Sequence, residues 1–194
     1  KLSEEGSGEL RHNEFSIEET GIICEGLSEL NLTEDKILEG RKGIVGRDES
    51  RIKLTAVKIY STGIGIEIRG SNNILVEKSK IKSENLGLRY EGESTGKIIE
   101  NKLEGEVGID VKDHSIVEAS GNEINAEKLG INIRGISQVI LGNNEIKSKN
   151  KGLIVKEQSN CIVKYNLFKG NSIGKIENIG INLNNNITVE INKN

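Results

Sequence analysis

The sequence predicts an all-β solenoid, in which one chain winds into about eight stacked coils of about 22 residues. Three observations predict it. Glycine recurs at a nearly constant step, apolar residues recur at two fixed distances from each glycine, and asparagine recurs at a third distance. Self-similarity at a fixed period is typical of repeat architectures, in which each unit buries its apolar face only by stacking on its neighbours.

The first predicted strand of each coil carries the pattern apolar–Gly–apolar–x–apolar. It is clearest at residues 64–68 (IGIEI), 86–90 (LGLRY), 107–111 (VGIDV) and 129–133 (LGINI). The recurring glycines are Gly21, Gly43, Gly65, Gly87, Gly108, Gly130 and Gly152, at steps of 22, 22, 22, 21, 22 and 22 residues. The alternation has period two and spans few residues, which indicates short strands and excludes helices.

Two further apolar positions complete the coil. Eleven residues after each glycine stand Leu32, Leu54, Val76, Ile98, Ala119, Leu141 and Val163. Sixteen residues after it stand Ile37, Ile59, Ile81, Leu103, Ile124, Ile146 and Phe168. Three short strands per coil, with coils about 4.8 Å apart, would bury these positions in continuous columns. Ile66, Leu88, Ile109, Ile131 and Leu153 are expected to form one such column.

Asparagine recurs fourteen residues after four successive glycines. The positions are Asn101, Asn122, Asn144 and Asn166, preceded in the same slot by Asp35, Val57 and Ser79. Asparagine tolerates the left-handed backbone of a tight turn, and stacked amides can hydrogen-bond along the axis. We therefore expect a structural ladder, with a row of ligand-binding amides as the alternative.

The ends of the chain fall inside coils. Asn13 and Phe15 fit the coil that precedes Gly21, so residues 1–20 are predicted to form a partial coil or a cap. Near the other end, Gly180 is predicted to restore the glycine strand 28 residues after Gly152, with an insertion loop at residues 169–175. The prediction is one domain over residues 1–194, whose open coil edges associate with another copy or with neighbouring domains of a longer chain.

The period, the Gly-Ile-x-Ile strand and the recurring Asn-x-Ile turn resemble the right-handed parallel β-helix of the pectate-lyase-like superfamily. The short, regular coils resemble its bacterial and archaeal surface-protein repeats, and the resemblance covers nearly the whole chain. It implies a right-handed, single-stranded parallel β-helix. This architecture is compatible with lyases, hydrolases, epimerases, adhesins and tailspikes, so the resemblance implies a fold and leaves the function open.

Charged residues alternate along the outer side of the glycine strand. Glu67, Arg89 and Asp110 alternate in sign between adjacent coils, and so do Arg69, Glu91 and Lys112. The first interpretation is a solvated face on which opposite charges stabilise strand pairing. The alternative is chemistry on uronic acids, which requires a base for the sugar C5 proton and a cation for the carboxylate.

Residues 108–115 (GIDVKDHS) carry that alternative, since they are similar to the Gly-x-Asp-Pro-His-Asp-x-Ser stretch of mannuronan C5-epimerases. The resemblance assigns Asp110 and Asp113 to the two acids, while Lys112 stands where that family has His. With Arg89 or Arg134 as a second cation, Lys112 could act in a lyase. The minimal turns after each glycine strand weigh against an enzyme, because uniform coils leave no water-excluding pocket.

Composition excludes several other classes. The net charge is -3, both signs are spread along the chain, and aromatic residues make up 3%, so no nucleic-acid partner is expected. No apolar run indicates membrane insertion or a signal peptide. Cys24 and Cys161, about six coils or 29 Å apart, are expected to be buried small hydrophobes. His12 and His114 have no partner at ligand spacing, so no metal or other cofactor is expected.

The sequence therefore predicts a structural β-solenoid segment of an extracellular or cell-surface protein. It would serve as a spacer, adhesin shaft or fibre subunit, with a polysaccharide lying weakly along the exposed strand. Two alternatives stay open: a uronate lyase or C5-epimerase, and an engineered solenoid, since the chain has no Pro, Met or Trp. Uneven coils and two cysteines argue against deliberate design.

Overall fold

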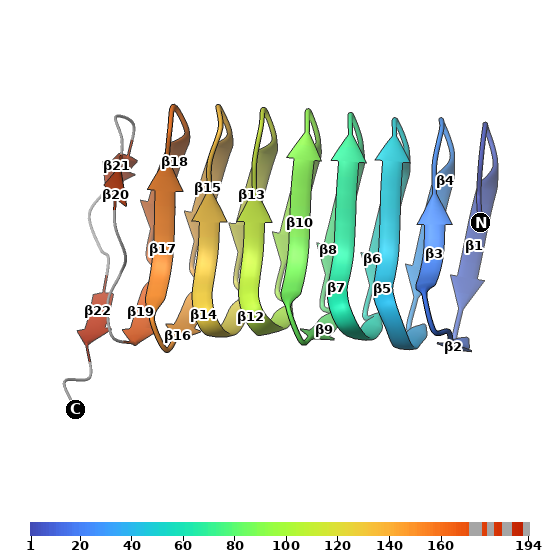
Figure 1. The fold of residues 1–194 in the computed structure, drawn as a ribbon, viewed down its shortest axis with the longest axis horizontal. Helices are drawn as coiled ribbons and strands as arrows, with labels where there is room; N and C mark the ends of the chain where they lie inside the picture. Colours follow the sequence, from blue (N-terminus) through green and yellow to red (C-terminus); the bar gives the residue numbers. More distant parts are fainter. Residues whose placement is uncertain (171–175, 178–180, 184–187, 192–194) are drawn as a thin grey trace.

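The computed structural model describes residues 1–170, together with the backbone of residues 176–177, 181–183 and 188–191. All elements of these residues are β-strands, and every strand pairing is parallel. Figure 1 shows the coils stacked along one axis in sequence order, from blue at one end toward orange at the other. The predicted all-β parallel solenoid is confirmed.

Each coil has three faces, which we number in chain order from the face that carries the glycine strands. The second face is a nine-stranded sheet with one strand per coil, formed by β1 (Ser7–Arg11), β4 (Glu29–Thr33), β6 (Arg51–Thr55), β8 (Asn73–Glu77), β11 (Thr95–Ile99), β13 (Ile116–Ser120), β15 (Gln138–Gly142), β18 (Asn160–Lys164) and β21 (Ile181–Leu183).

The third face and the first face, which carries the glycine strands, belong to one continuous sheet of thirteen strands. In four coils a single bent strand crosses both faces: β5 (Lys36–Asp48), β7 (Lys58–Gly70), β12 (Lys102–Val111) and β14 (Glu123–Ile133). The other strands of the third face are β2 (Glu14–Ser16), β9 (Lys80–Ser83), β16 (Glu145–Ser148), β19 (Leu167–Gly170) and β22 (Thr188–Ile191). The other strands of the first face are β3 (Thr20–Cys24), β10 (Leu86–Gly92), β17 (Lys151–Lys156) and β20 (Ile176–Glu177).

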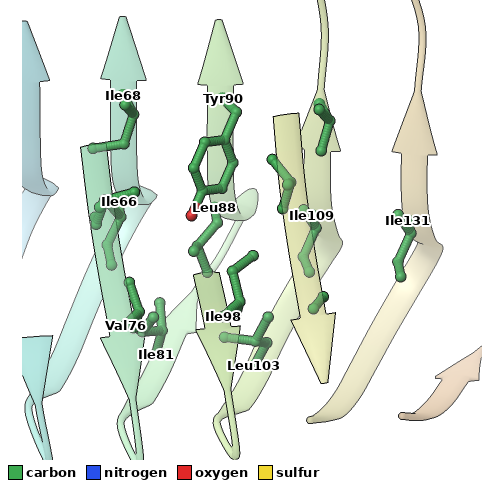
Figure 2. Packing of buried hydrophobic residues seen from close by; sticks show 14 of the residues in the cluster. Ile66, Ile68, Val76, Ile81, Leu88, Tyr90, Ile98, Leu103, Ile109 and Ile131 are labelled. Carbon is green, nitrogen blue, oxygen red and sulfur yellow. The ribbon is translucent and has the colours of Figure 1, made fainter. Parts of the chain in front are cut away.

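The core is the stack of inward columns that the period predicts. Ile66, Leu88, Ile109, Ile131 and Leu153 are in register through successive strand pairs, and all five are buried. Figure 2 shows four of these side chains, Ile66, Leu88, Ile109 and Ile131, lying in line along the axis. The repeating glycine has a steric reason, since a Cβ on Gly65 would lie 2.4 Å from the Ile81 side chain across the coil.

One coil fills its core differently. Tyr90 occupies the inward slot that Ile68 and Val111 hold in the neighbouring coils, and it is fully buried (Figure 2). The opposing position of the same coil is Gly96, where Ile74 and Val117 stand on either side. A Cβ on Gly96 would lie 2.3 Å from the tyrosine ring, so the small residue makes room for the large one. The Tyr90 hydroxyl is buried without a hydrogen-bond partner.

The asparagine ladder is confirmed as a structural feature. In the four asparagine coils the side-chain oxygen accepts the backbone N–H of the ladder residue one coil earlier, as from Asn101 to Asn122 at 2.8 Å. The side-chain nitrogen donates to the next amide oxygen, as from Asn122 to Asn144 at 2.8 Å. Asp35 and Ser79 play the acceptor role in the earlier coils, toward the N–H groups of Asn13 and Val57.

The expected conformation of this turn was wrong by one residue. The left-handed backbone belongs to the residue before the ladder position, namely His12, Glu34, Ala56, Lys78, Glu100, Gly121, Asn143 and Tyr165. The ladder asparagines themselves are outside that region, and their buried amides bond to backbone groups of the neighbouring coil.

A second polar ladder lies between the first and second faces. Its members, all buried, are Ser28, Ser50, Asn72, Ser94, Ser115, Ser137 and Ser159. Ser94 donates to the Glu91 and Gly70 carbonyls, both at 2.9 Å, so it ties its own turn to the preceding coil. In the sequence this ladder is a polar residue seven positions after each recurring glycine. The apolar and asparagine positions considered above do not include it.

The pairing differs from expectation at the C-terminal end, and the N-terminal residues form part of a coil. Residues 7–11 form β1, which pairs with β4, and Leu2 makes an isolated bridge to Cys24, so part of the first coil edge is covered from within the chain. At the other end, Ile181 pairs with Cys161 on the second face and Val189 with Phe168 on the third. The predicted 28-residue spacing from Gly152 to Gly180 is therefore wrong, since these offsets are 20 and 21 residues. Residues 171–175 of the predicted insertion loop lie outside the described residues.

Irregular pairing gathers at one corner. The register shifts lie between Ile37 and Lys42 and between Gly105 and Val107, where the third face bends into the first. The 21-residue coil loses its residue at the second of these places, because Gly105 pairs at an offset of 21 and Val107 at an offset of 22. The strands on either side keep their register.

Candidate functional site

The first face brings Arg89, Asp110 and Arg134 together. Arg89 and Asp110 are register partners on β10 and β12, so they lie side by side on adjacent coils. Arg89 Nε donates to Asp110 Oδ2 at 3.3 Å, and Arg134 Nη2 donates to the same oxygen at 3.2 Å. Asn132, one coil further on, donates its Nδ2 to Asp110 Oδ1 at 2.8 Å. Both carboxylate oxygens of Asp110 are therefore engaged.

The same network extends to the preceding coils through Glu67. Its carboxylate accepts from Lys42 Nζ at 2.5 Å and from Arg69 Nη2 at 2.8 Å, and Arg89 Nη1 lies 3.6 Å away. Burial alone would raise the pKa of Glu67, but the hydrogen bonds and charges of Lys42 and Arg69 outweigh it and hold the pKa below its usual range. Glu67 is thus a stably ionised acid between cations.

The remaining two candidates point elsewhere. Lys112 Nζ pairs with Glu91 at 2.9 Å, and Glu91 is in turn 3.6 Å from Arg69 Nε. Asp113 lies in the turn beyond the strand, with a left-handed backbone, and its carboxylate accepts the Gly92 N–H at 3.0 Å. Asp113 repeats the role of Asp48 and Glu157, whose carboxylates accept the N–H of Gly26 and Gly135. The two acids of the epimerase-like stretch are thus held by different partners.

The expectation of a solvated charge ladder is wrong for the acids. Glu67 is 1% exposed and Asp110 is 5% exposed, because arginine and lysine side chains cover them. The cations lie on the outside, with roughly half of the Arg69 side chain and 41% of the Arg134 side chain exposed. The side chains of Arg69 and Arg134 are therefore partly exposed to solvent, and Glu67 and Asp110 lie buried beneath them. Sequence periodicity places these residues on the outer side of the strand but does not show which of them covers the other.

Proton abstraction at Asp110 would require breaking this arrangement. A general base must reach the proton that it removes, within about 3 Å. The Asp110 oxygens are enclosed and already accept three hydrogen bonds. The chemistry that the geometry favours at this place is charge neutralisation within the solenoid.

Two grooves in the described residues lie on other faces. One, of about 470 Å³, runs over the second face across β8, β11, β13, β15 and β18. The other, of about 1140 Å³, follows the corner between the third and first faces and is lined by residues such as Lys82, Glu104 and Lys149. Asp110 and Lys112 line neither of them.

Cysteine and metal chemistry can be stated for the described part of the chain. Cys24 and Cys161 are free thiols and fully buried, and burial raises the pKa of the Cys161 thiol to about 12. The described residues hold no group of three or more His, Cys, Asp or Glu side chains placed to hold a metal ion. They also hold no helix with the length and apolarity needed to span a membrane.

Comparison with known proteins gives one match. A family model described as "Right handed beta helix region" matches the chain over residues 20–126 and again over residues 43–194. These two matches together run from the first glycine strand to the last residue. Searches of curated proteins and of solved structures found no match.

Proposed function

The chain belongs to the right-handed β-helix family, and from this premise we propose that it is a rigid structural segment. It serves as a spacer, shaft or fibre subunit of a protein at the cell surface or outside the cell. Its partners in this role are another copy stacked on a coil edge or a neighbouring domain of a longer chain.

One observation carries this proposal: the polar side chains that could do chemistry are used to join one coil to the next. Asp110 accepts from residues of the coils before and after it. Glu67 accepts from Lys42 of the preceding coil and forms an ion pair with Arg89 of the next one. The asparagine ladder links Asn101 to Asn166 through every intervening coil. Buried polar groups with all their partners in place stiffen a structure and specify one arrangement. A rod built in this way resists bending at every layer.

The rigidity can be measured with spin labels. Thr55→Cys and Lys164→Cys place two labels on the second face, five coils and therefore about 24 Å apart. The native thiols do not compete, because Cys24 and Cys161 are buried. We expect a single narrow distance distribution in electron–electron double resonance, unchanged by salt. A broad distribution would contradict a rigid spacer. Antibody labelling of intact cells tests the surface location, and staining that requires permeabilised cells would contradict it.

A second candidate function, weak binding of an acidic polysaccharide, is favoured by the charge on the first face. Arg47, Arg69, Lys112, Arg134 and Lys156 occupy five of six consecutive outward positions, and only Glu91 interrupts them. We call these five residues the cationic row. Cations repeating at about 4.8 Å form a linear positive surface that attracts a polyanion, and salt weakens that attraction.

Binding and turnover assays on the same polysaccharides distinguish polysaccharide binding from the enzyme alternative. We expect polygalacturonate and alginate to bind weakly in low salt, and Arg69→Ala with Arg134→Ala to weaken that binding. Lys53→Ala, on the second face, is the control. We expect no unsaturated product in an ultraviolet assay and no epimerised sugar by nuclear magnetic resonance. Turnover that disappears in Asp110→Ala or Lys112→Ala would overturn the structural role and establish a uronate lyase or C5-epimerase.

A further inference from the structure

The second face exposes apolar side chains next to a groove. Ile116 on β13 is 50% exposed and Ile140 on β15 is 44% exposed, whereas large apolar residues elsewhere in the coils are mostly buried. Leu75 on β8 and Ile162 on β18 line the same groove of about 470 Å³ and are partly exposed. Exposed apolar side chains gathered on a water-facing sheet are characteristic of an interaction surface.

Charge lies at the centre of this patch. The middle outward positions of successive strands are Leu75, Lys97, Glu118, Ile140 and Ile162, in register across β8, β11, β13, β15 and β18. Lys97 and Glu118 pair with each other at 3.3 Å, and both are exposed. The row therefore reads apolar, positive, negative, apolar, apolar. When the order of its first four members is reversed, each charge meets the opposite charge and each apolar residue meets an apolar residue.

We propose that this face is the interface of a closed homodimer, in which two copies pack their second faces together with antiparallel solenoid axes. A two-fold axis parallel to the strands and midway between β11 and β13 reverses the coil order and keeps the strand direction. Lys97 of one copy then faces the partner's Glu118, Leu75 faces the partner's Ile140, and Thr95 faces the partner's Ile116. The central charges form a four-membered cluster of alternating sign, flanked by apolar pairs.

A second copy fits this face because the complementarity is that of the face with itself. An isologous interface requires that each residue contact the partner residue that contacts it in return. The first four members of the row, in reversed order, meet this condition for charge and for apolar character alike. Facing sheets usually pack about 10 Å apart, a distance that the outward side chains of two such rows fill together.

The size of the patch sets the strength of the dimer. Four strands at about 4.8 Å and five residues at about 3.3 Å cover roughly 19 by 16 Å, or about 300 Å² on each copy. Standard interfaces bury about 800 Å² per partner. We therefore expect a weak, concentration-dependent dimer. This inference stands apart from the proposed spacer role, since a lateral pair can form whether or not the rods also stack at their ends.

Charge reversal with mixing tests the arrangement. Lys97→Glu sets a carboxylate against the carboxylate of the partner's Glu118, and Glu118→Lys sets two ammonium groups against each other. We therefore expect each variant alone to dimerise at least tenfold more weakly. An equimolar mixture of the two variants restores opposite charges at both central contacts as a heterodimer. Sedimentation velocity from about 10 µM to 1 mM measures all three samples, and circular dichroism confirms that each variant is folded.

The matched control is a pair on another face. Lys102 and Glu123 form a ladder pair at 3.4 Å on the third face with similar exposure, so Lys102→Glu and Glu123→Lys should leave dimerisation unchanged. Ile140→Ser should weaken the dimer without altering the charges. A monomer throughout this range overturns the proposal. So does a dimer insensitive to Lys97 and Glu118, or variants that mixing does not rescue. End-to-end stacking is distinguishable, because it produces a growing series of oligomers rather than a closed dimer.

Discussion

Removing one amide from the middle of the asparagine ladder should destabilise the whole solenoid measurably. Asn122 is buried, and its Oδ1 accepts from the Asn101 N–H at 2.8 Å and from Asn101 Nδ2 at 3.1 Å. Its Nδ2 donates to the Ile98 carbonyl at 2.7 Å and to Asn144 Oδ1 at 2.8 Å. Asn122→Ala removes four hydrogen bonds, each contributing about 1 kcal/mol, and leaves the buried Asn101 N–H without this acceptor. We expect a loss of about 3–5 kcal/mol in the free energy of unfolding.

A natural serine in the ladder indicates a variant with an effect between those of asparagine and alanine. Ser79 stands in the same ladder slot, and its hydroxyl accepts the Val57 N–H at 3.0 Å. Asn122→Ser keeps that acceptor and loses the amide donors, so we expect roughly half the effect of the alanine variant. Asn125→Ala is the control, because Asn125 is only half-buried and bonds to Glu123 at the surface.

Urea unfolding followed by far-ultraviolet circular dichroism measures the three variants, and hydrogen exchange at Asn101 reports the local loss. If Asn122→Ala and Asn122→Ser both unfold within about 1 kcal/mol of the parent chain, the ladder does not stabilise the fold and the reasoning fails.

Three further predictions concern the core and the charges. Ile109→Asp places an unpaired charge in a dry column, so we expect a loss of several kcal/mol in urea unfolding, and a stable folded variant would contradict the column. Gly96→Val should destabilise the fold, because the added side chain overpacks the Tyr90 ring. Adding Tyr90→Val to that variant should recover stability, since Val111 and Val117 occupy the same two slots in the next coil. Additive losses in the free energy of unfolding would contradict the pairing. The folded-state pKa of Glu67 is below that of the unfolded chain, so its ion pairs stabilise the fold at neutral pH and this contribution is lost as the pH falls through the lowered pKa. Glu67→Gln should therefore be less stable than the parent at neutral pH, with the difference shrinking as the pH falls below the ordinary range of glutamate, and a constant difference in urea unfolding would refute this.

Most of the fold could be predicted because the period acts on every strand at once. A slot such as that of Gly65 recurs in seven coils, so one displaced residue does not hide it, and the inward columns follow from the two-residue alternation. The prediction for the final coil was wrong because it depended on one local match and not on a recurring slot. The Gly-Ile-Asn-Leu stretch at residues 180–183 matches the glycine strand locally, whereas strand pairing assigns Ile181 to the second face beside Cys161.

The site could be predicted less well. Periodicity places Asp110 and Arg134 on one outer surface, and in the structure they form an ion pair at 3.2 Å. It does not say that long cationic side chains fold over the shorter acids, because that depends on side-chain reach and on the desolvation of each charge. Periodicity also does not predict that Asp113 lies apart from Asp110. Asp113 itself has the left-handed backbone of the turn, and no glycine in the local sequence marks that conformation.

The corner where the third face bends into the first has a consequence for how such a chain changes length. All three register shifts of the described strands lie there, and the coil that is one residue short lacks that residue there while its three strands keep their register. Insertions and deletions at this corner are absorbed locally, whereas the same change within a strand would turn every following side chain to the opposite face. The corner is thus a natural graft point. Peptides inserted after Gly105 and at the matching place in other coils would be displayed in a line, at intervals set by the stacking of the rod.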